Sequence, residues 1–313
     1  MPFKQEPQKF SSKINTLIIG VGGNEIALGG ENVLPFYTFD APIENRPKIG
    51  AAISDSGYFK GVPGVEAYYE GAETAVDAAK KAVAMPGVDF LVISLDGAHP
   101  DHGDKSPEEC AALVKEIADA ISVPIVVEGS KHIEKDAKIF EKVSEAVQGK
   151  NILVLSAREE DYKPVAAAAG LAYAQNVGAE SAVDINLAKQ LNVLISQMGV
   201  KTEKMAMNLG SAAAGYGFEY VASTIDRVKG AALAQNDAML QMPIITPVYS
   251  ETWTVKESIA SEEDYPEWGS AEVRGVNMEV ATAAACLAAG SNAVILLHPD
   301  SVKAVSKLID ALV

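Results

Sequence analysis

The chain has 313 residues, with 26 Lys and Arg against 42 Asp and Glu, so its formal net charge is −16. A negative field of this size repels polyanions, which excludes nucleic acid and an anionic membrane surface as main partners. The two cysteines, Cys110 and Cys286, are too few for a four-thiolate iron–sulfur cluster, a cysteine-rich zinc site or a disulfide scaffold. We therefore expect a cytoplasmic protein, and the polar first 13 residues and the lack of an apolar run of membrane-spanning length agree with this.

The first predicted element is a β-hairpin. Residues 16–19 and 25–28 are short apolar runs on either side of a Gly/Asn turn at 22–24. The stretch 20–25 has some of the spacing of a dinucleotide-binding loop, but it ends in Glu25 and no helical pattern follows, so a turn is favoured. We assign residues 1–47 to an N-terminal tail and hairpin extension that covers or plugs one end of the fold.

From residue 48 onward, short apolar runs alternate with amphipathic helical patterns. The predicted strands are residues 48–54, 89–95, 124–128, 151–155, 171–175, 204–208, 242–248 and 292–297. Several of them are apolar almost throughout, which is typical of parallel strands buried on both faces. Eight strands, each followed by a helix, predict an α/β fold of the (β/α)8 TIM-barrel type over residues 48–313. A doubly wound sheet is the alternative, but it usually has fewer strands.

Local signals mark several helix starts and one long loop. Ser106, Pro107 and Glu109 form a capping pattern, Asp184 is a weaker cap, and the last helix starts at about residue 300. The longest irregular stretch, residues 251–270, is acidic and contains two tryptophans. Loops of this length in a compact fold are often functional or bind a partner.

Polar residues follow nearly every predicted strand. In a TIM barrel the carboxyl ends of the strands converge on one mouth, where ligands bind. The strand-end residues are Asp55, Asp96, Gly97, Glu128, Gly129, Ser130, Ser156, Gln175, Asn176, Asn208, Tyr249, Ser250, Glu251 and His298. Asp96 directly follows an apolar strand, so it is either a structural acid that accepts loop amides or a hydrogen-bonding group for a polar heterocycle or an amide-bearing ligand.

Other motifs are weaker. Residues 99–102 place two histidines and an aspartate in one loop, where a solvated loop is favoured over a metal site. The small-residue loop 208–217 allows a planar ligand or another subunit to approach closely, while a phosphate site lacks an adjacent Lys or Arg. No strand carries a Schiff-base lysine and no metal spacing is present, which disfavours an aldolase-like enzyme, and we assign no catalytic residue.

Six stretches together carry a family resemblance: 29–36, 44–47, 95–98, 184–192, 215–220 and 265–269. They include Glu44-Asn45-Arg46-Pro47, Leu95-Asp96-Gly97-Ala98 and Gly215-Tyr216-Gly217-Phe218-Glu219-Tyr220. With these motifs the sequence resembles the small subunit of corrinoid iron–sulfur proteins, which is also the delta subunit of acetyl-CoA decarbonylase/synthase complexes. The resemblance runs from about residue 15 to the C-terminus.

This resemblance implies a TIM barrel related to pterin-binding methyltransferases, in a heterodimer with a large subunit. The large subunit would hold a [4Fe–4S] cluster and a cobalamin, and the mouth of the small subunit would cover one face of that corrinoid. A methyl group would pass from methyltetrahydrofolate, through its methyltransferase, to cobalt. It would then reach the carbon monoxide dehydrogenase/acetyl-CoA synthase of the Wood–Ljungdahl pathway.

Two features of the sequence agree with a subunit that covers the corrinoid without binding its metal. Two cysteines cannot ligate the cluster, and no D-x-H-x-x-G cobalamin-ligating motif is present, so this chain is expected to supply no metal ligand. The resemblance implies corrinoid contacts from the mouth loops, and the expected residues are Asp96, Gly97, Asn176, Asn208, Gly210 and Tyr249.

Two alternatives remain. One is a stand-alone pterin-dependent methyltransferase that uses Asp55, Asp96 and Asn176. The other is a structural subunit whose mouth never meets the corrin.

Overall fold

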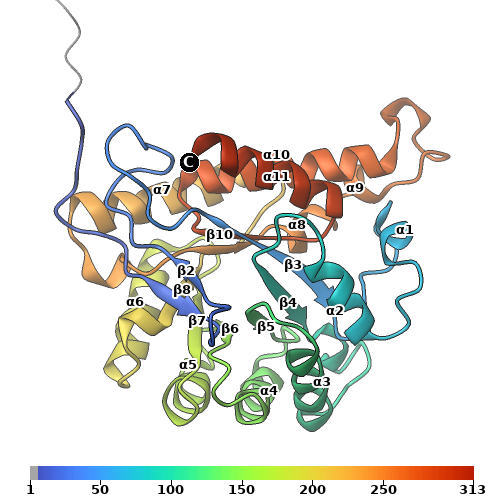
Figure 1. Ribbon diagram of the computed structural model, residues 1–313, viewed down its shortest axis with the longest axis horizontal. Helices are drawn as coiled ribbons and strands as arrows, with labels where there is room; N and C mark the ends of the chain where they lie inside the picture. Colours follow the sequence, from blue (N-terminus) through green and yellow to red (C-terminus); the bar gives the residue numbers. More distant parts are fainter. Residues whose placement is uncertain (1–5) are drawn as a thin grey trace, which may run out of the picture.

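The computed structural model describes residues 6–313, so the first five residues of the predicted N-terminal extension lie outside the described part. Eight parallel strands pair in the order β8-β7-β6-β5-β4-β3-β10-β9 (Figure 1). A parallel bridge joins Met207 of β8 to Ile244 just before β9, and the Met207 N–H donates to the Pro243 carbonyl at 2.9 Å. This bridge brings the two edges of the sheet together, which confirms the predicted TIM barrel.

The observed strands follow the predicted apolar runs closely at seven of eight positions. They are β3 (Lys48–Ser54), β4 (Phe90–Ser94), β5 (Ile125–Glu128), β6 (Leu153–Ala157), β7 (Asn176–Glu180), β8 (Met205–Asn208), β9 (Ile245–Pro247) and β10 (Ala293–Leu296). The side chains of β4 are buried along its whole length, as expected for a strand covered on both faces. The division of the chain at residues 47 and 48 stays a prediction, and β3 starts at Lys48.

The strand predicted at residues 171–175 is wrong. Residues 171 and 172 end a π-helical segment (Ala166–Ala172), and the strand β7 starts five residues later than predicted, at Asn176. The alanine-rich run continues the preceding helix, whereas the true strand contains Gly178 and looks weak by composition. Glycine fits there because a Cβ at Gly178 would overlap the present position of the Leu155 side chain on β6.

Most of the helices cover the outer face of the barrel (Figure 1). The helices of the described residues are α1 (Val65–Tyr69), α2 (Ala75–Val83), α3 (Pro107–Ala120), α4 (Ile133–Ala146), α5 (Tyr162–Val165), α6 (Ile185–Gln197), α7 (Phe218–Ala234), α8 (Tyr249–Thr252), α9 (Lys256–Ile259), α10 (Ala271–Ala289) and α11 (Pro299–Leu312). The predicted caps are confirmed: Ser106 and Glu109 form a capping box at α3, and Asp184 caps α6. No helix in residues 6–313 is both long and apolar enough to cross a bilayer.

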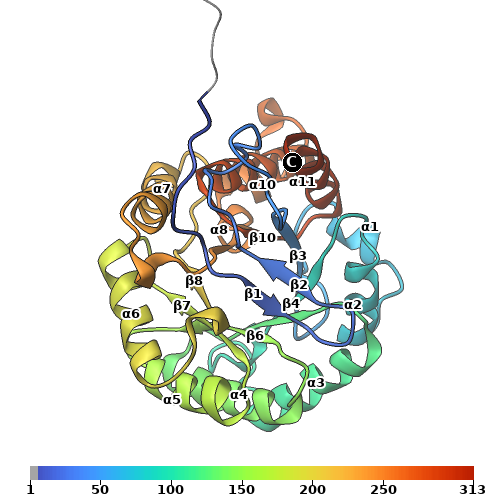
Figure 2. The ribbon, with the colours of Figure 1, turned by 60° about the vertical axis from the view of Figure 1, so that its left-hand side comes forward.

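The predicted hairpin is confirmed as β1 (Leu17–Ile19) and β2 (Ile26–Leu28), which pair antiparallel. Figure 2 looks along the barrel with this hairpin across the near end. The side-chain amides of Asn151 and Asn176 both donate to the Ile18 carbonyl, at 2.9 and 3.0 Å. Because these asparagines precede or begin β6 and β7, the hairpin covers the amino end of the barrel and leaves the carboxyl end open.

A buried ion pair ties the N-terminal segment to the barrel wall. Lys229 of α7 lies 2.6 Å from Glu31, and their side chains are only 3 % and 11 % exposed. Asn292 donates to the same Glu31 oxygen at 2.8 Å. Burial raises the pKa of Glu31, but the charge and hydrogen bond of Lys229 and the amide of Asn292 outweigh it, so the pKa lies below its usual value.

We predict that Lys229→Met lowers the free energy of unfolding by about 3–5 kcal/mol, because it leaves the Glu31 carboxylate buried without its cation. Urea denaturation followed by circular dichroism measures this loss. Lys189→Met is the matched control, since its pair with Asp237 includes a half-exposed lysine and should contribute less than about 1 kcal/mol. Equal losses in the two variants would contradict the structural role of the pair.

Candidate functional site at the barrel mouth

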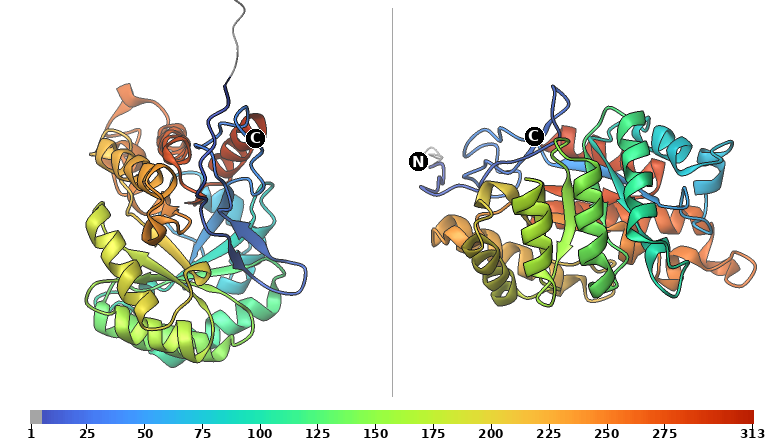
Figure 3. Two further views of the ribbon diagram at one scale, coloured as in Figure 1. Left: turned by 90° about the vertical axis from the view of Figure 1, so that its left-hand side faces the viewer. Right: turned by 90° about the horizontal axis from the view of Figure 1, so that it is seen from below.

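The carboxyl ends of the strands open onto a hollow with two connected lobes. Both lobes share Ser94, Gly129, Lys131 and Ser250. Figure 3 shows that this end of the barrel lies opposite the N-terminal segment. The hollow is therefore built by the loops that follow the strands, as the position of ligand sites in TIM barrels predicts.

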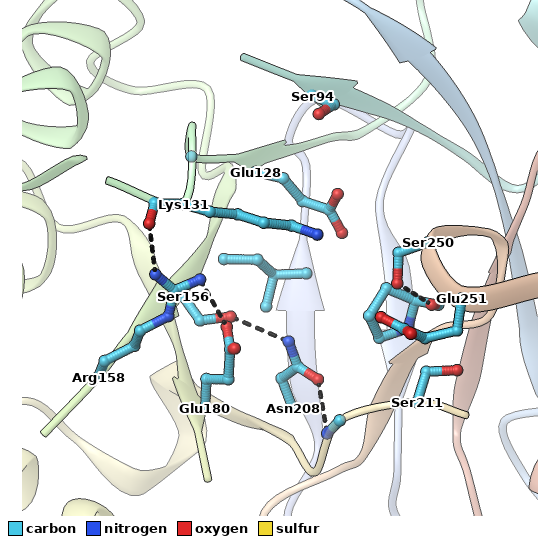
Figure 4. Close-up of a pocket in the computed structure, with 14 residues that line it drawn as sticks. Ser94, Glu128, Lys131, Ser156, Arg158, Glu180, Asn208, Ser211, Ser250 and Glu251 are labelled. Atoms are coloured by element: carbon cyan, nitrogen blue, oxygen red, sulfur yellow. Dashed lines mark hydrogen bonds and ion pairs between the residues drawn. The ribbon is translucent and has the colours of Figure 1, made fainter. Parts of the chain in front are cut away.

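The first lobe is polar. It is lined by side chains from β5 to β9, including Glu128, Lys131, Arg158, Glu180 and Asn208. In Figure 4, Glu128 and Lys131 extend over the cavity from one side while Asn208 points into it from the opposite side. Arg158 pairs with Glu180 at 3.4 Å on the wall. The lobe thus offers carboxylate acceptors and two cations within one small space.

The central interaction of the hollow joins Glu128 to Tyr249. Glu128 ends β5 and Tyr249 begins α8, and the phenol donates to the Glu128 carboxylate at 2.5 Å. Burial raises the pKa of Glu128 from its ordinary 4.5 to about 7, against the opposing effects of the Tyr249 hydrogen bond and the Lys131 charge. Burial and the nearby Glu128 also hold the pKa of Tyr249 well above its usual range, so the phenol stays a donor.

The second lobe has an apolar wall. Phe59, Val62, Trp253 and Leu297 line it, and the Phe59 ring lies 5.4 Å from that of Tyr249. Asp96 lies at its polar edge, where the Oδ1 atom is buried without a hydrogen-bond partner among the described residues. Burial raises the pKa of Asp96, and the nearby Asp55 carboxylate acts in the same direction. This lobe suits a flat apolar surface that carries polar groups at its margin.

The neighbouring Asp55 and Gly97 hold this edge in place. The Gly97 N–H donates to Asp55 Oδ1 at 3.2 Å, and Lys105 lies 3.0 Å from the other oxygen. A Cβ at Gly97 would lie 2.7 Å from Asp55 Oδ1, so only glycine allows this approach. Asp55 is therefore engaged within the fold, and Gly97 acts by its small size.

The predicted residues Asn208 and Gly210 lie together in the polar lobe. Asn208 donates to Ser156 at 3.2 Å and accepts from the Gly210 N–H at 3.0 Å. Gly210 has a φ of +83°, a left-handed conformation that favours glycine. These contacts shape the loop after β8, so the hollow brings together four of the expected contact residues: Asp96, Asn208, Gly210 and Tyr249.

Asn176 lies elsewhere, so its expected place at the mouth is corrected. It starts β7 at the amino end and hydrogen-bonds to the hairpin, because the strand begins where the sequence suggested that it ends. The same shift hid Glu180, which ends β7 and lines the hollow. Reading the run 176–180 as a strand would have found it. Lys131 and Arg158 each lie three residues beyond a predicted strand end, and nothing in the sequence pattern singled them out.

Some strand-end residues serve the fold instead. His298 precedes α11, and its ring accepts the Asp300 N–H at 3.1 Å as a helix cap.

The rings of His99 and His102 lie 5.1 Å apart, and that of His132 lies 5.8 Å from His99. Within residues 6–313 no group of three or more His, Cys, Asp or Glu side chains is arranged to hold a metal ion.

An extension beside the mouth, residues 251–270, projects away from the barrel; we call it the arm (Figure 1). Arg274 at the start of α10 donates to three carbonyls of the arm, at positions 257, 260 and 269. Tyr265 stacks on Trp268 with ring centres 4.3 Å apart, and Lys256 lies over the Tyr265 ring. The long loop is therefore an ordered structure.

The chain is similar to proteins of a known family. Residues 16–294 match the CO dehydrogenase/acetyl-CoA synthase delta subunit family. The chain belongs to this family.

Curated relatives agree. This delta-family chain is 32 % identical to the acetyl-CoA decarbonylase/synthase complex subunit delta 1 of Methanosarcina thermophila over 94 % of its own length and 67 % of that protein. It is also 32 % identical to subunit delta of Methanothermobacter thermautotrophicus, over 96 % of this chain and 76 % of that protein. The subunit delta of Archaeoglobus fulgidus is 30 % identical, over 99 % and 70 %.

Among solved structures, the delta-family chain resembles dihydropteroate synthases. The enzyme from Vibrio fischeri superposes with a TM-score of 0.58 at 12 % identity, over 94 % of this chain and 97 % of that one. The enzyme from Xanthomonas albilineans gives 0.57 at 13 % identity, over 95 % and 98 %. At this identity the likeness supports the barrel fold alone.

We predict that Glu128→Gln stabilises the chain above pH 7. Because the pKa of Glu128 is about 7 in the folded chain and near 4.5 when unfolded, the folded state binds more protons between these values. Stability is therefore lost as pH rises through this window, by up to about 3 kcal/mol at pH 8. The gain of the variant should vanish below pH 4.5, as thermal or urea unfolding across pH will measure.

The control is Glu116→Gln on the exposed face of α3, which should change stability little at any pH. A Glu128→Gln variant less stable than the parent at pH 8 would show that the ionised carboxylate is stabilised by its surroundings, against this prediction.

Proposed function

We propose that this chain is the small subunit of a corrinoid iron–sulfur protein. It pairs with a large subunit that carries a cobalamin and a [4Fe–4S] cluster, and its barrel mouth covers one face of the corrinoid. The pair then carries a methyl group from methyltetrahydrofolate, by way of its methyltransferase, to carbon monoxide dehydrogenase/acetyl-CoA synthase. The observation that carries the proposal is the open, two-lobed hollow at the mouth of a chain of the delta subunit family.

The residues of the mouth fit a corrinoid. A corrin is a broad, largely apolar ring with amide groups around its edge, and the hollow pairs an apolar wall of Phe59 and Trp253 with acceptors at Glu128 and Asp96. Gly129 and Gly210 line the hollow with backbone atoms alone. The corrinoid supplies the methyl-accepting metal, while this chain orients the group and excludes water from it.

The cysteines support a cluster on the partner. Cys110 and Cys286 are both buried and free, and they lie on different helices, α3 and α10. Burial raises the pKa of Cys110 to about 11 and that of Cys286 to about 12, so both thiols stay protonated near neutral pH. Iron–sulfur ligation requires thiolates, which these positions do not supply.

The arm supports a partner surface next to the mouth. Ile259 on the arm, and Tyr220 and Val273 nearby on the starts of α7 and α10, are 44 %, 67 % and 58 % exposed. Exposed apolar side chains beside a binding site are typical of protein–protein contacts. We propose that the large subunit covers this region when its corrinoid meets the hollow.

A second candidate is a stand-alone pterin-dependent methyltransferase. The observation that favours it is the group of acids at the mouth, Asp55, Asp96 and Glu128, on a barrel that resembles dihydropteroate synthase. Asp55 is already engaged by Gly97 and Lys105, and the expected Asn176 lies at the other end of the barrel, so the first proposal is better supported.

We predict that Ser211→Trp fills the hollow and weakens corrinoid retention about tenfold while the two subunits still pair. Ser211 is chosen because Gly210, beside it, has a left-handed backbone that any larger residue would strain. Co-purification with the large subunit, followed by size-exclusion chromatography at the corrinoid absorbance, measures both quantities. Ser122→Trp, at an exposed site by the amino end, is the control. Equal loss of pairing and corrinoid would place the site elsewhere.

The two candidates are separated by testing the chain alone with methyltetrahydrofolate and free reduced cobalamin. Under the first proposal, methyl transfer in the absence of a methyltransferase stays at the uncatalysed rate, because the chain acts as a lid and not as a catalyst. The visible spectrum of the cobalamin follows the reaction. Rapid transfer by the chain alone would support the second candidate.

A further inference from the structure

Glu128 and Tyr249 form a hydrogen-bonded pair in the hollow, and the fold leaves one oxygen of the Glu128 carboxyl group without a donor among the described residues. Tyr249 occupies one carboxylate oxygen of Glu128, and the carboxyl group faces the cavity (Figure 4). Asn208 and Ser250, which share the lobe, are instead engaged by Ser156, Gly210 and the Pro247 carbonyl. The floor therefore keeps an open acceptor at its centre.

The position of Glu128 is costly for the fold, which points to a ligand. Glu128 is partly buried and makes no ion pair among the described residues, and a carboxyl group in such a place disfavours folding when it ionises. The hydrogen bond from Tyr249 offsets part of this cost and fixes the orientation of the carboxyl group. A second acceptor, Asp96 Oδ1, is buried in the adjoining lobe without a partner in residues 6–313. Two open acceptors in one hollow match a ligand that presents N–H donors.

We infer that Glu128, oriented by Tyr249, is a binding subsite for an uncharged N–H donor group, the chemistry of a carboxamide or of the amino-pyrimidinone edge of a pterin. The carboxamides at the rim of a corrinoid and the ring of a folate are two sources of this chemistry. This inference rests on the proposed function for the first source. The second source does not depend on it.

The electrostatics of the site set the expected pH dependence. The charged or titratable groups that act on Glu128 include Lys131 from the loop after β5, Glu180 from β7, Asp96 from the turn after β4 and Tyr249 from α8. Arg158, just after β6, and Glu251 of α8 line the same lobe. Lys131 and Tyr249 favour the ionised form, and the two acids oppose it. Since a carboxylate accepts an N–H more strongly than a neutral carboxyl group does, binding should strengthen as Glu128 loses its proton.

The test compares the parent chain with Glu128→Gln in two arms. In one, the complex with the large subunit is assayed for cobalamin retention between pH 6 and 8. In the other, the chain alone is titrated with methyltetrahydrofolate by calorimetry over the same range. We expect a loss of affinity of about 10- to 100-fold at pH 8 in one arm, and a pH dependence in the parent that is absent from the variant. The arm that responds identifies the source.

Two further variants sharpen the result. Tyr249→Phe removes a hydrogen bond that lowers the pKa of Glu128, so the midpoint of the pH dependence should move upward. Glu116→Gln, on the exposed face of α3, should leave affinity within about twofold. The unfolding measurements on Glu128→Gln show directly whether a loss of binding comes with a loss of folded protein.

Unchanged affinity in both arms, or affinity that falls as pH rises, would overturn the subsite. Where the folate arm is also unchanged, retention of cobalamin by a Glu128→Gln complex, together with its loss on Ser211→Trp, would overturn the subsite and leave the proposed function intact. Failure of the two chains to pair at all would count against the proposed function, and the folate arm would still decide the subsite.

Discussion

Closure of the sheet is the constraint on which the rest of the structure depends. The hydrogen bond from Met207 to Pro243 and the bridge to Ile244 join the two edges. In a closed parallel barrel all strands point the same way, so polar residues from distant parts of the chain meet at one rim. Glu128 and Tyr249 are 121 positions apart in the sequence, and they meet only because β5 and β9 belong to the same ring.

The polar side chains at the two ends of the barrel differ in their hydrogen bonding. At the amino end, the side-chain amides of Asn151 and Asn176 bond to the hairpin, and Lys204 bonds to Asn151. At the mouth, Glu128 and Asp96 keep acceptor oxygens that no donor in residues 6–313 engages. Buried polar groups in proteins are normally satisfied, and the buried atoms without a partner among the described residues include Asn176 Oδ1 at the amino end as well as Asp96 Oδ1 at the mouth. The two ends differ in that the hairpin closes the amino end, whereas the carboxyl end opens onto the hollow.

Glu128 connects stability to binding. Its burial raises its pKa to about 7, so the carboxylate weakens the fold under the conditions in which it accepts hydrogen bonds best. Glu128 is the last residue of β5, and the hydroxyl group of Tyr249 from α8 donates a hydrogen bond to it. Residues held in such environments are common at binding and catalytic sites, where the surroundings are arranged for the ligand rather than for stability.

Local sequence patterns determined the class of fold, seven of the eight strands, the hairpin and the cap at Ser106. Apolar runs indicated the strands, a Gly/Asn turn the hairpin, and the spacing of Ser106 and Glu109 the cap. The motifs between residues 29 and 269 likewise indicated the family, because they consist of short runs of neighbouring residues. Tertiary packing decided the start of β7. Glycine is unfavourable in most strands, but at position 178 it leaves the space that the Leu155 side chain of the neighbouring strand occupies. It also moved Asn176 away from the mouth and brought Glu180 to it, because the end of the barrel that a residue reaches depends on where its strand begins.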